Sequence, residues 1–140
     1  MPYIKTFELI KPLIEQNTNF VLLSHINTDG DALGSAIALD HYLKDLGKKS
    51  SILIPGEIPY KYEFLEAKSL VNQGSYQEQS DAISNADVIF ILDISGLKRL
   101  NIYYEDTKNS KAQKILIDHH PVDPDWVSHS VIVVEKIATA

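Results

Sequence analysis

The sequence predicts an α/β domain, a three-layer sandwich in which a mainly parallel sheet of about five strands carries helices on both faces. Two observations predict it. Short apolar segments alternate along the chain with segments of helical periodicity, the order expected of parallel strands joined by crossover helices. The strands are also apolar throughout, as in FVLL at 20–23, which is typical of strands covered on both faces.

The first half of the chain predicts two helices and two strands. Apolar residues at helical spacing predict a helix over 3–17, and the run FVLL that follows predicts a strand over 20–23. Helical spacing returns from Ala32 to Leu46, before Gly47, and predicts a second helix. A second strand is expected over 51–54, where a Pro-Gly pair closes it.

The second half predicts further strands separated by helical and polar segments. The expected elements are a short helical piece over 60–67, a helix over 77–85, strands over 87–92 and 114–117, and an apolar stretch over 131–134. Residues 69–76 show no pattern that predicts either a helix or a strand, and a polar segment follows Asp93.

Composition narrows the class of protein. A length of 140 residues with 44% apolar residues suits one folded domain, and a net charge of −6 argues against a nonspecific binder of duplex DNA. The sequence has no cysteine, which excludes disulfides and zinc-thiolate sites and leaves carboxylates and imidazoles as the metal ligands. The first residues lack a signal-peptide core, so we expect a cytoplasmic protein without a membrane partner.

Ionisable residues follow three of the predicted strands. They are His25, Asp29 and Asp31 after the first, Asp93 after the third, and Asp118, His119 and His120 after the fourth. In open α/β sheets, ligands bind beyond the carboxyl ends of the strands, where these residues would meet. Buried there without a cation they would repel one another, so the pattern favours a metal site.

Each cluster alone also has an ordinary structural explanation. An Asp-Gly-Asp sequence before a helix is often a capped turn, and a pair of adjacent histidines often lies in a surface loop. A calcium loop aligned on Gly30 would place His25 first and Ala36 last, where carboxylates are needed. Phosphate-binding glycine motifs and a serine nucleophile motif are absent from the sequence.

Mixed imidazole and carboxylate ligands suit manganese, magnesium, iron or zinc, with manganese a good compromise. Two neighbouring divalent ions bridged by one aspartate would activate a water and clamp the attacking and leaving oxygens of a phosphoryl group. The sequence therefore predicts two divalent ions, with Mn²⁺ preferred, and hydrolysis of phosphoesters.

The motifs HINTDGDALGS, ILDIS and IDHHPV together resemble those of the DHH phosphoesterase family. The resemblance covers nearly the whole chain, including IPYKYEFLE, and is strongest to the bacterial oligoribonuclease branch. That branch degrades very short RNAs and often dephosphorylates 3′-phosphoadenosine 5′-phosphate. A short RNA or small nucleotide is therefore the expected partner, and duplex DNA is not.

The resemblance also implies roles for individual residues. It gives His25 and Asp29 to one metal, Asp31 to the other, Asp93 as the bridge, His119 as a further ligand, His120 facing the scissile phosphate, and Asp118 orienting a histidine. Catalytic roles are thus implied for Asp93, Asp118 and His120. Thr28 stands where the family usually has proline, which should alter loop stiffness more than ligation.

Three further residues are candidates for substrate binding by their place in the motifs. Asn27 and Ser35 match positions near the site, and Arg99 lies in SGLKRL, similar to the second motif. Arg99 could contact phosphate or base, or could equally be a solvated helix residue.

Members of this branch continue with a fourth motif, whose aspartate completes the second metal site, and with a glycine-rich substrate-binding domain of the DHHA1 type. Neither is present in residues 1–140. We expect these residues to form an incomplete DHH domain with weak activity, and the full-length protein to form a homodimer. Two alternatives remain open: a nucleotide-binding or metal-binding module without turnover, and an inorganic pyrophosphatase-like member of the same superfamily.

Overall fold

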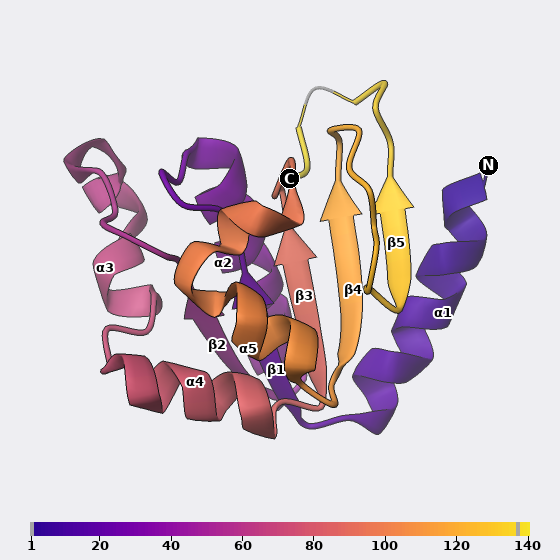
Figure 1. Cartoon of the computed structure of the whole chain (residues 1–140), viewed down its shortest axis with the longest axis horizontal. Helices are drawn as coiled ribbons and strands as arrows, with labels where there is room; N and C mark the ends of the chain where they lie inside the picture. The colour runs from indigo at the N-terminus through magenta and orange to yellow at the C-terminus, as the bar shows by residue number, and fades with distance from the viewer. Residues whose placement is uncertain (1, 137) are drawn as a thin grey trace.

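Five parallel strands form a single sheet at the centre of the domain (Figure 1). The computed structural model describes residues 2–136 and 138–140. The strands are β1 (Asn19–Leu23), β2 (Lys49–Leu53), β3 (Val88–Leu92), β4 (Gln113–Asp118) and β5 (His129–Ile132), in the spatial order β2-β1-β3-β4-β5. The predicted α/β class with a sheet of about five strands is confirmed.

Helical segments cover both faces of the sheet, as predicted. One apolar cluster joins the sheet to α1 (Pro2–Gln16), α2 (Gly30–Asp45) and α3 (Ala67–Leu70). The other joins it to α4 (Tyr76–Asn85), the 3₁₀ helix η2 (Leu97–Tyr103) and α5 (Tyr104–Asn109). Figure 1 shows α4 and α5 in front of the sheet and α2 behind it.

Alternation along β1 shows why its residues 20–23 are all apolar. Phe20 and Leu22 belong to the first cluster, whereas Val21 and Leu23 belong to the second. Because successive side chains of a strand point to opposite faces, a strand covered on both faces needs apolar residues at every position.

The structure departs from the sequence prediction mainly in two places. The helical piece predicted over 60–67 is divided into the 3₁₀ helix η1 (Tyr60–Leu65) and α3, because Glu66 has a left-handed φ of 54°. The polar segment after Asp93 forms η2 and α5, which were not predicted. Asn101, with φ 53° and ψ −116°, interrupts η2 and obscures its helical pattern.

The strand order places a topological switch point between β1 and β3. From β1 the chain crosses to β2 on one side, whereas from β3 it crosses to β4 on the other side. The connections therefore diverge from the ends of two neighbouring strands, which leaves a crevice at the carboxyl edge of the sheet. Among the described residues, no helix has the length and apolar character needed to cross a membrane.

Candidate metal centre

His25 lies immediately after β1, with its imidazole held in one orientation by the backbone. Its Nδ1 lies 2.7 Å from the carbonyl oxygen of Ile26. With its proton on Nδ1, the imidazole donates to this carbonyl and keeps the Nε2 lone pair free. Arg99 lies against the same pair of atoms, with its Nη2 3.0 Å from His25 Nδ1 and 3.2 Å from the Ile26 carbonyl oxygen, to which it donates. The His25 side chain is buried, with 3% exposure.

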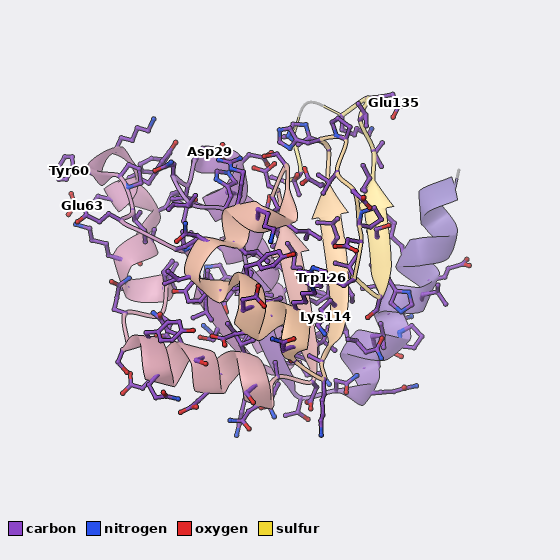
Figure 2. The ribbon with its side chains drawn as sticks, in the orientation of Figure 1. Asp29, Tyr60, Glu63, Lys114, Trp126 and Glu135 are labelled. Atoms are coloured by element: carbon purple, nitrogen blue, oxygen red, sulfur yellow. The ribbon has the colours of Figure 1, made fainter. Side chains whose placement is uncertain are left out.

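Asp29 directly precedes α2 (Figure 2) and also faces His25. Its Oδ1 accepts a hydrogen bond from the backbone N–H of Ala32 at 2.9 Å, which makes it the N-cap of the helix. Its other oxygen, Oδ2, lies 3.6 Å from His25 Nε2. The ordinary explanation for Asp29, a helix cap, is thus correct for one oxygen and leaves the second available to a ligand.

Asp31, in the first turn of α2, accepts hydrogen bonds from the segment that follows β5. The backbone N–H of Thr139 lies 2.8 Å from Oδ2, and that of Ala140 lies 2.9 Å from Oδ1. Figure 1 shows this segment returning from β5 toward the end of β3. Burial alone would raise the pKa of Asp31, but these backbone donors outweigh it and hold the pKa below its usual value.

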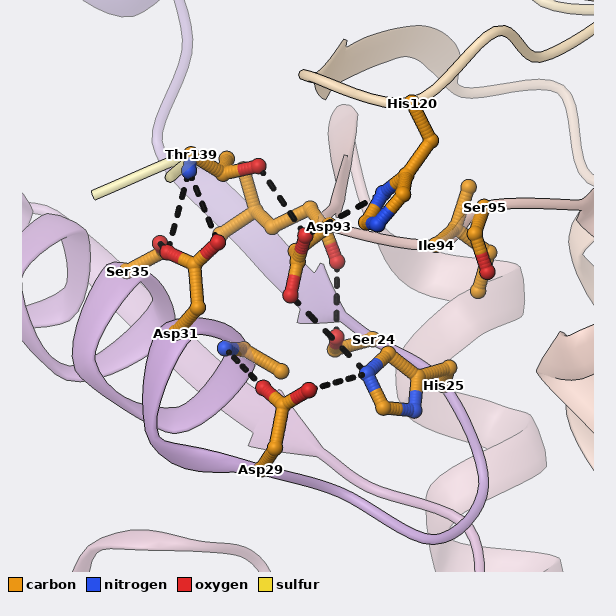
Figure 3. Close-up of polar contacts among 12 residues, drawn as sticks. Ser24, His25, Asp29, Asp31, Ser35, Asp93, Ile94, Ser95, His120 and Thr139 are labelled. Atoms are coloured by element: carbon orange, nitrogen blue, oxygen red, sulfur yellow. Dashed lines mark hydrogen bonds and ion pairs between the residues drawn. The ribbon is translucent and has the colours of Figure 1, made fainter. Parts of the chain in front are cut away.

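Asp93 follows β3 and lies at the centre of the cluster (Figure 3). Its side chain is 2% exposed, and its φ of 51° is in the left-handed region that Asp and Asn tolerate better than most residues. Burial, together with the charges of Asp31 and Asp29, raises its pKa to about 6. An isolated carboxylate is unfavourable here, so the position calls for a compensating positive charge.

The two oxygens of Asp93 face two different histidines. Oδ2 lies 3.9 Å from His25 Nε2, and Oδ1 lies 3.3 Å from His119 Nε2. His119 Nε2 is also 3.3 Å from Asp31 Oδ2, while its Nδ1 lies 3.2 Å from the carbonyl oxygen of Lys136. Each histidine therefore presents Nε2 to two carboxylates and binds a backbone carbonyl through Nδ1.

We call His25, Asp29 and Asp93 the His25 half-site, and His119, Asp31 and Asp93 the His119 half-site. An imidazole nitrogen without a proton and a carboxylate oxygen both accept, so neither contact is favourable by itself. A divalent cation between them satisfies both groups, and the backbone bond at Nδ1 is the usual support of a metal-binding histidine. The residue types of both half-sites therefore suit divalent cations. The ligand atoms of His25, Asp29 and Asp93 lie within 4.8 Å of one another, as do those of Asp93 and His119 together with Asp118 and His120.

Asp118 ends β4 and differs from the other aspartates because backbone donors saturate it. Its Oδ2 accepts from the N–H groups of Ile94 and Ser95, both at 2.8 Å. Its Oδ1 accepts from the N–H groups of His119 and His120 and from His120 Nδ1, at 2.7, 3.0 and 2.7 Å. Asp118 thus fixes the loops after β3 and β4 and orients the His120 ring.

His120 is the most exposed of the three candidate histidines. Its side chain is 40% exposed, and its Nδ1 lies 3.5 Å from Asp93 Oδ1. The bond from Nδ1 to Asp118 leaves Nε2 free for a group outside the protein. His120 is therefore placed to contact an anion beside Asp93, and that role stays a prediction.

The predicted substrate-binding residues differ in how close they lie to the centre. Ser35 Oγ is 3.4 Å from Asp31 Oδ1, so it lies beside the His119 half-site. Asn27 is exposed in the loop after β1, with a left-handed φ of 57°. Arg99 uses Nη1 on Ser95 Oγ at 2.5 Å and Nη2 on Ile26, so it is engaged with the protein behind His25.

The sequence did not point to Thr139 as a member of the cluster. Its hydroxyl lies 3.2 Å from Asp93 Oδ1, and its amide binds Asp31 (Figure 3). Nothing in the local sequence of Thr139 distinguishes it from an ordinary tail residue. Its contact with Asp31 spans 108 positions and depends on where β5 ends.

Comparison with known proteins agrees with this geometry. Residues 19–138 match the model of the DHH family, N-terminal domain. The crystal structure of an exopolyphosphatase-related protein from Bacteroides fragilis matches with a TM-score of 0.88 and 30% identity, over 94% of this chain and 39% of that one. An uncharacterized protein of Methanocaldococcus jannaschii is 32% identical over 120 residues, which are 83% of this chain and 23% of that protein.

The chain thus spans about two fifths of the Bacteroides fragilis protein and about a quarter of the Methanocaldococcus jannaschii protein. The matched region contains all three motifs and every residue of both half-sites. The chain belongs to the DHH family and carries its N-terminal domain.

Proposed function

We propose that the chain is the catalytic part of a metal-dependent phosphoesterase that hydrolyses short oligoribonucleotides or small nucleotides. The observation that carries the proposal is the position of Asp93, whose two carboxylate oxygens each face the Nε2 of a different histidine. This geometry fits two neighbouring cations that share one carboxylate. Membership of the DHH family supports hydrolysis of phosphoesters, and the resemblance of the motifs to the oligoribonuclease branch supports the RNA substrate.

Divalent ions bound at the two half-sites would lower the pKa of water and supply the positive charge that a phosphoryl displacement requires. The residues of the chain perform the remaining tasks. Asp29 and Asp31 hold the outer side of each half-site, while the backbone carbonyls of Ile26 and Lys136 keep the imidazoles in the binding tautomer. His120, oriented by Asp118, faces the phosphate and stabilises the charge that develops on it.

In the proposed reaction, the oxygen of water forms a bond to phosphorus as the phosphorus–oxygen bond of the ester breaks. The leaving oxygen takes a proton, and the products are a phosphate monoester and an alcohol, or inorganic phosphate and a nucleoside derivative. Asn27, exposed in the loop after β1, and Ser35, buried beside Asp31, offer neutral polar groups to the substrate.

The direct test compares the wild-type protein with Asp93→Asn on pApA and on 3′-phosphoadenosine 5′-phosphate, with Mn²⁺ and with EDTA. Asn suits the left-handed backbone at this position, so the variant should fold. We expect Mn²⁺-dependent release of AMP that falls at least about a thousandfold in the variant, since the ions supply several kcal/mol of transition-state stabilisation. Equal activity of the two proteins would contradict the proposal.

A second candidate function is hydrolysis of a phosphoanhydride, such as pyrophosphate or short polyphosphate. The observation that favours it is the similarity to the exopolyphosphatase-related protein of Bacteroides fragilis. Turnover of pyrophosphate or tripolyphosphate at least tenfold faster than turnover of pApA would select this candidate. Binding of Mn²⁺ without turnover of any of these compounds would instead assign the chain the role of a binding module.

A further inference from the structure

A second concave site lies beside the candidate metal centre and contains none of its residues. It is a pocket of about 540 Å³ between the segment after β2, α3, the start of α4 and the end of η2. Its volume falls within the range of small-molecule binding sites, roughly 300–1,000 Å³. No role has been given to it by the motifs or by the metal chemistry.

Two structural elements connect this pocket with the metal centre. The helix η2 carries Arg99, which binds the Ile26 carbonyl beside His25, and three residues later Ile102, which lines the pocket. On the other side, a Cβ atom at Gly56 in the pocket wall would lie 3.6 Å from Ile26. Gly56 in the pocket wall therefore lies against Ile26, the residue that follows His25 of the candidate metal centre.

The floor of the pocket carries an amide group with unused hydrogen-bonding capacity. The Gln79 side chain is buried, accepts a bond from the Tyr103 hydroxyl at 2.8 Å, and donates one to the Asn72 carbonyl at 3.1 Å. A primary amide has two donors and two acceptor positions, so one donor and one acceptor are not used by these bonds. Gln79 lines the pocket, and an amide that can still donate one bond and accept one can bind the N6 and N7 edge of adenine.

The pocket combines aliphatic and polar lining residues. Ile54 and Val71 are buried, and Ile58 and Ile102, the latter 50% exposed, add further aliphatic surface. Asn72 and Gln73 are among the polar residues of the lining. Such a mixed lining suits a heterocycle, because the ring faces lose water while the ring edge keeps hydrogen bonds.

The mouth of the pocket carries one charge of each sign. Lys68 is exposed there and can attract a phosphate, and the exposed carboxylate of Glu57 can accept hydrogen bonds from ribose hydroxyls. This order of groups, from amide floor to charged mouth, matches the order base, ribose and phosphate in a nucleotide.

We propose that this pocket binds the base and ribose of a nucleotide, with adenine fitting the Gln79 amide, while a neighbouring phosphate lies at the Asp93 centre. The assignment rests on the proposed function, because it takes the nucleotide to be the substrate or product of that centre. In this proposal Gln79 and Ile102 determine the specificity of the reaction that takes place at the Asp93 centre.

The test is a titration of the metal-free chain with adenosine and, separately, with ribose, followed by NMR of the Gln79 side-chain amide and the Ile102 methyl groups. We expect saturable shifts of both signals with adenosine and none with ribose. Ile102→Trp, which fills the pocket from a half-exposed position, should weaken adenosine binding at least tenfold. Leu9→Trp, at a similarly exposed position on α1, is the matched control and should bind as the wild type does.

Several results would overturn the proposal: unshifted Gln79 with adenosine, equal shifts with ribose, or unchanged binding by Ile102→Trp. If that variant fails to fold, Ile58→Trp fills the pocket from another part of its wall and decides the question. If the pocket instead binds a protein segment, adenosine should not shift the Gln79 amide signal, and that result also overturns the proposal. The NMR titration needs neither metal nor turnover, so a failure of the pocket proposal can be distinguished from a failure of the phosphoesterase proposal.

Discussion

A buried aspartate lies at the carboxyl end of β3 and another at that of β4, and the two differ in the number of hydrogen bonds that they accept. Asp118 accepts five hydrogen bonds from N–H donors of the protein. Asp93 accepts one, from the Thr139 hydroxyl, and otherwise faces imidazole nitrogens. Both are at most 3% exposed. Burial therefore does not distinguish these two aspartates, whereas the number of donors around each does: Asp118 is a positioning residue, and Asp93 is left to face a ligand.

The same contrast exists across the sheet. At the amino edge, Asp87 Oδ2 accepts from the backbone N–H groups of Thr18 and Asn19, at 3.1 and 2.9 Å. Buried Asp40 pairs with Lys44 at 2.7 Å and with the Ser50 hydroxyl. The carboxyl edge instead gathers Asp29, Asp31 and Asp93 around two histidines, and no lysine or arginine among the described residues pairs with these three carboxylates. The negative charge left there is available to a cation.

The largest effect on stability is expected from Asp118→Ala. This change leaves five N–H donors near the sheet without their acceptor, and it should lower the free energy of unfolding by at least about 3 kcal/mol. Thermal unfolding should shift down by about 10 °C. Asp81→Ala, exposed on α4, is the control and should change the midpoint by less than about 2 °C. A small effect of Asp118→Ala would mean that its bonds do not hold the two loops.

Asp93→Asn should raise the free energy of unfolding of the metal-free protein, whereas Asp118→Ala lowers it. Because the pKa of Asp93 is raised from 3.8 to about 6, the folded state holds its proton more tightly than the unfolded state. That contribution to stability is full below pH 3.8 and is lost as the pH rises through 6. The variant, which cannot ionise, should therefore gain up to about 3 kcal/mol over wild type at pH 8.

Urea unfolding in EDTA at pH 4 and pH 8 measures this difference between the variant and the wild type. The gain should be large at pH 8 and close to zero at pH 4. A variant less stable than wild type at pH 8 would contradict the account of Asp93 as an uncompensated carboxylate.

Asp29→Asn and Asp29→Ala separate the two roles of Asp29. Asn retains the N-cap but loses the charge, so Mn²⁺ affinity should fall about tenfold while helix stability is kept. Ala should lose the same affinity and about 1 kcal/mol of unfolding free energy as well. Calorimetry with Mn²⁺ and thermal unfolding in EDTA measure the two quantities. Unaltered affinity in both variants would remove Asp29 from the His25 half-site.

The smallest effect concerns Thr28, whose hydroxyl is a third kind of buried polar group. Its Oγ1 is buried without a hydrogen-bond partner among the described residues. Thr28→Val removes this group and keeps the side-chain shape, so it should stabilise the protein by about 1 kcal/mol. Thermal unfolding in EDTA checks this, and a destabilised variant would show that the hydroxyl has a partner in solution.

The sequence predicted the sheet because its central strands carry runs that are buried on both faces and apolar at every position, over 20–23 in β1 and over all of β3. It also predicted that His25, Asp29, Asp93 and His119 gather, since the carboxyl ends of parallel strands share an edge. Asp118 and Asp93 looked alike in the sequence, because each follows an apolar run. Their difference comes from backbone N–H groups of Ile94 and Ser95, which depend on a loop conformation that residue types do not reveal.

Arg99 and Thr139 show the same limit. Arg99 reaches the Ile26 carbonyl through η2, a helix whose pattern is interrupted at Asn101. Thr139 reaches Asp31 only because the chain turns back after β5. Neither contact has a local signal.

The central claim is that Asp93 joins two cation half-sites, one at each carboxylate oxygen. Anomalous diffraction from crystals of the chain grown with Mn²⁺ tests it most directly. The account predicts two peaks about 3.5–4 Å apart, one between Asp93 and His25 and the other between Asp93 and His119, and loss of the pair in Asp93→Asn. A single peak, or two peaks that do not share Asp93, would contradict it.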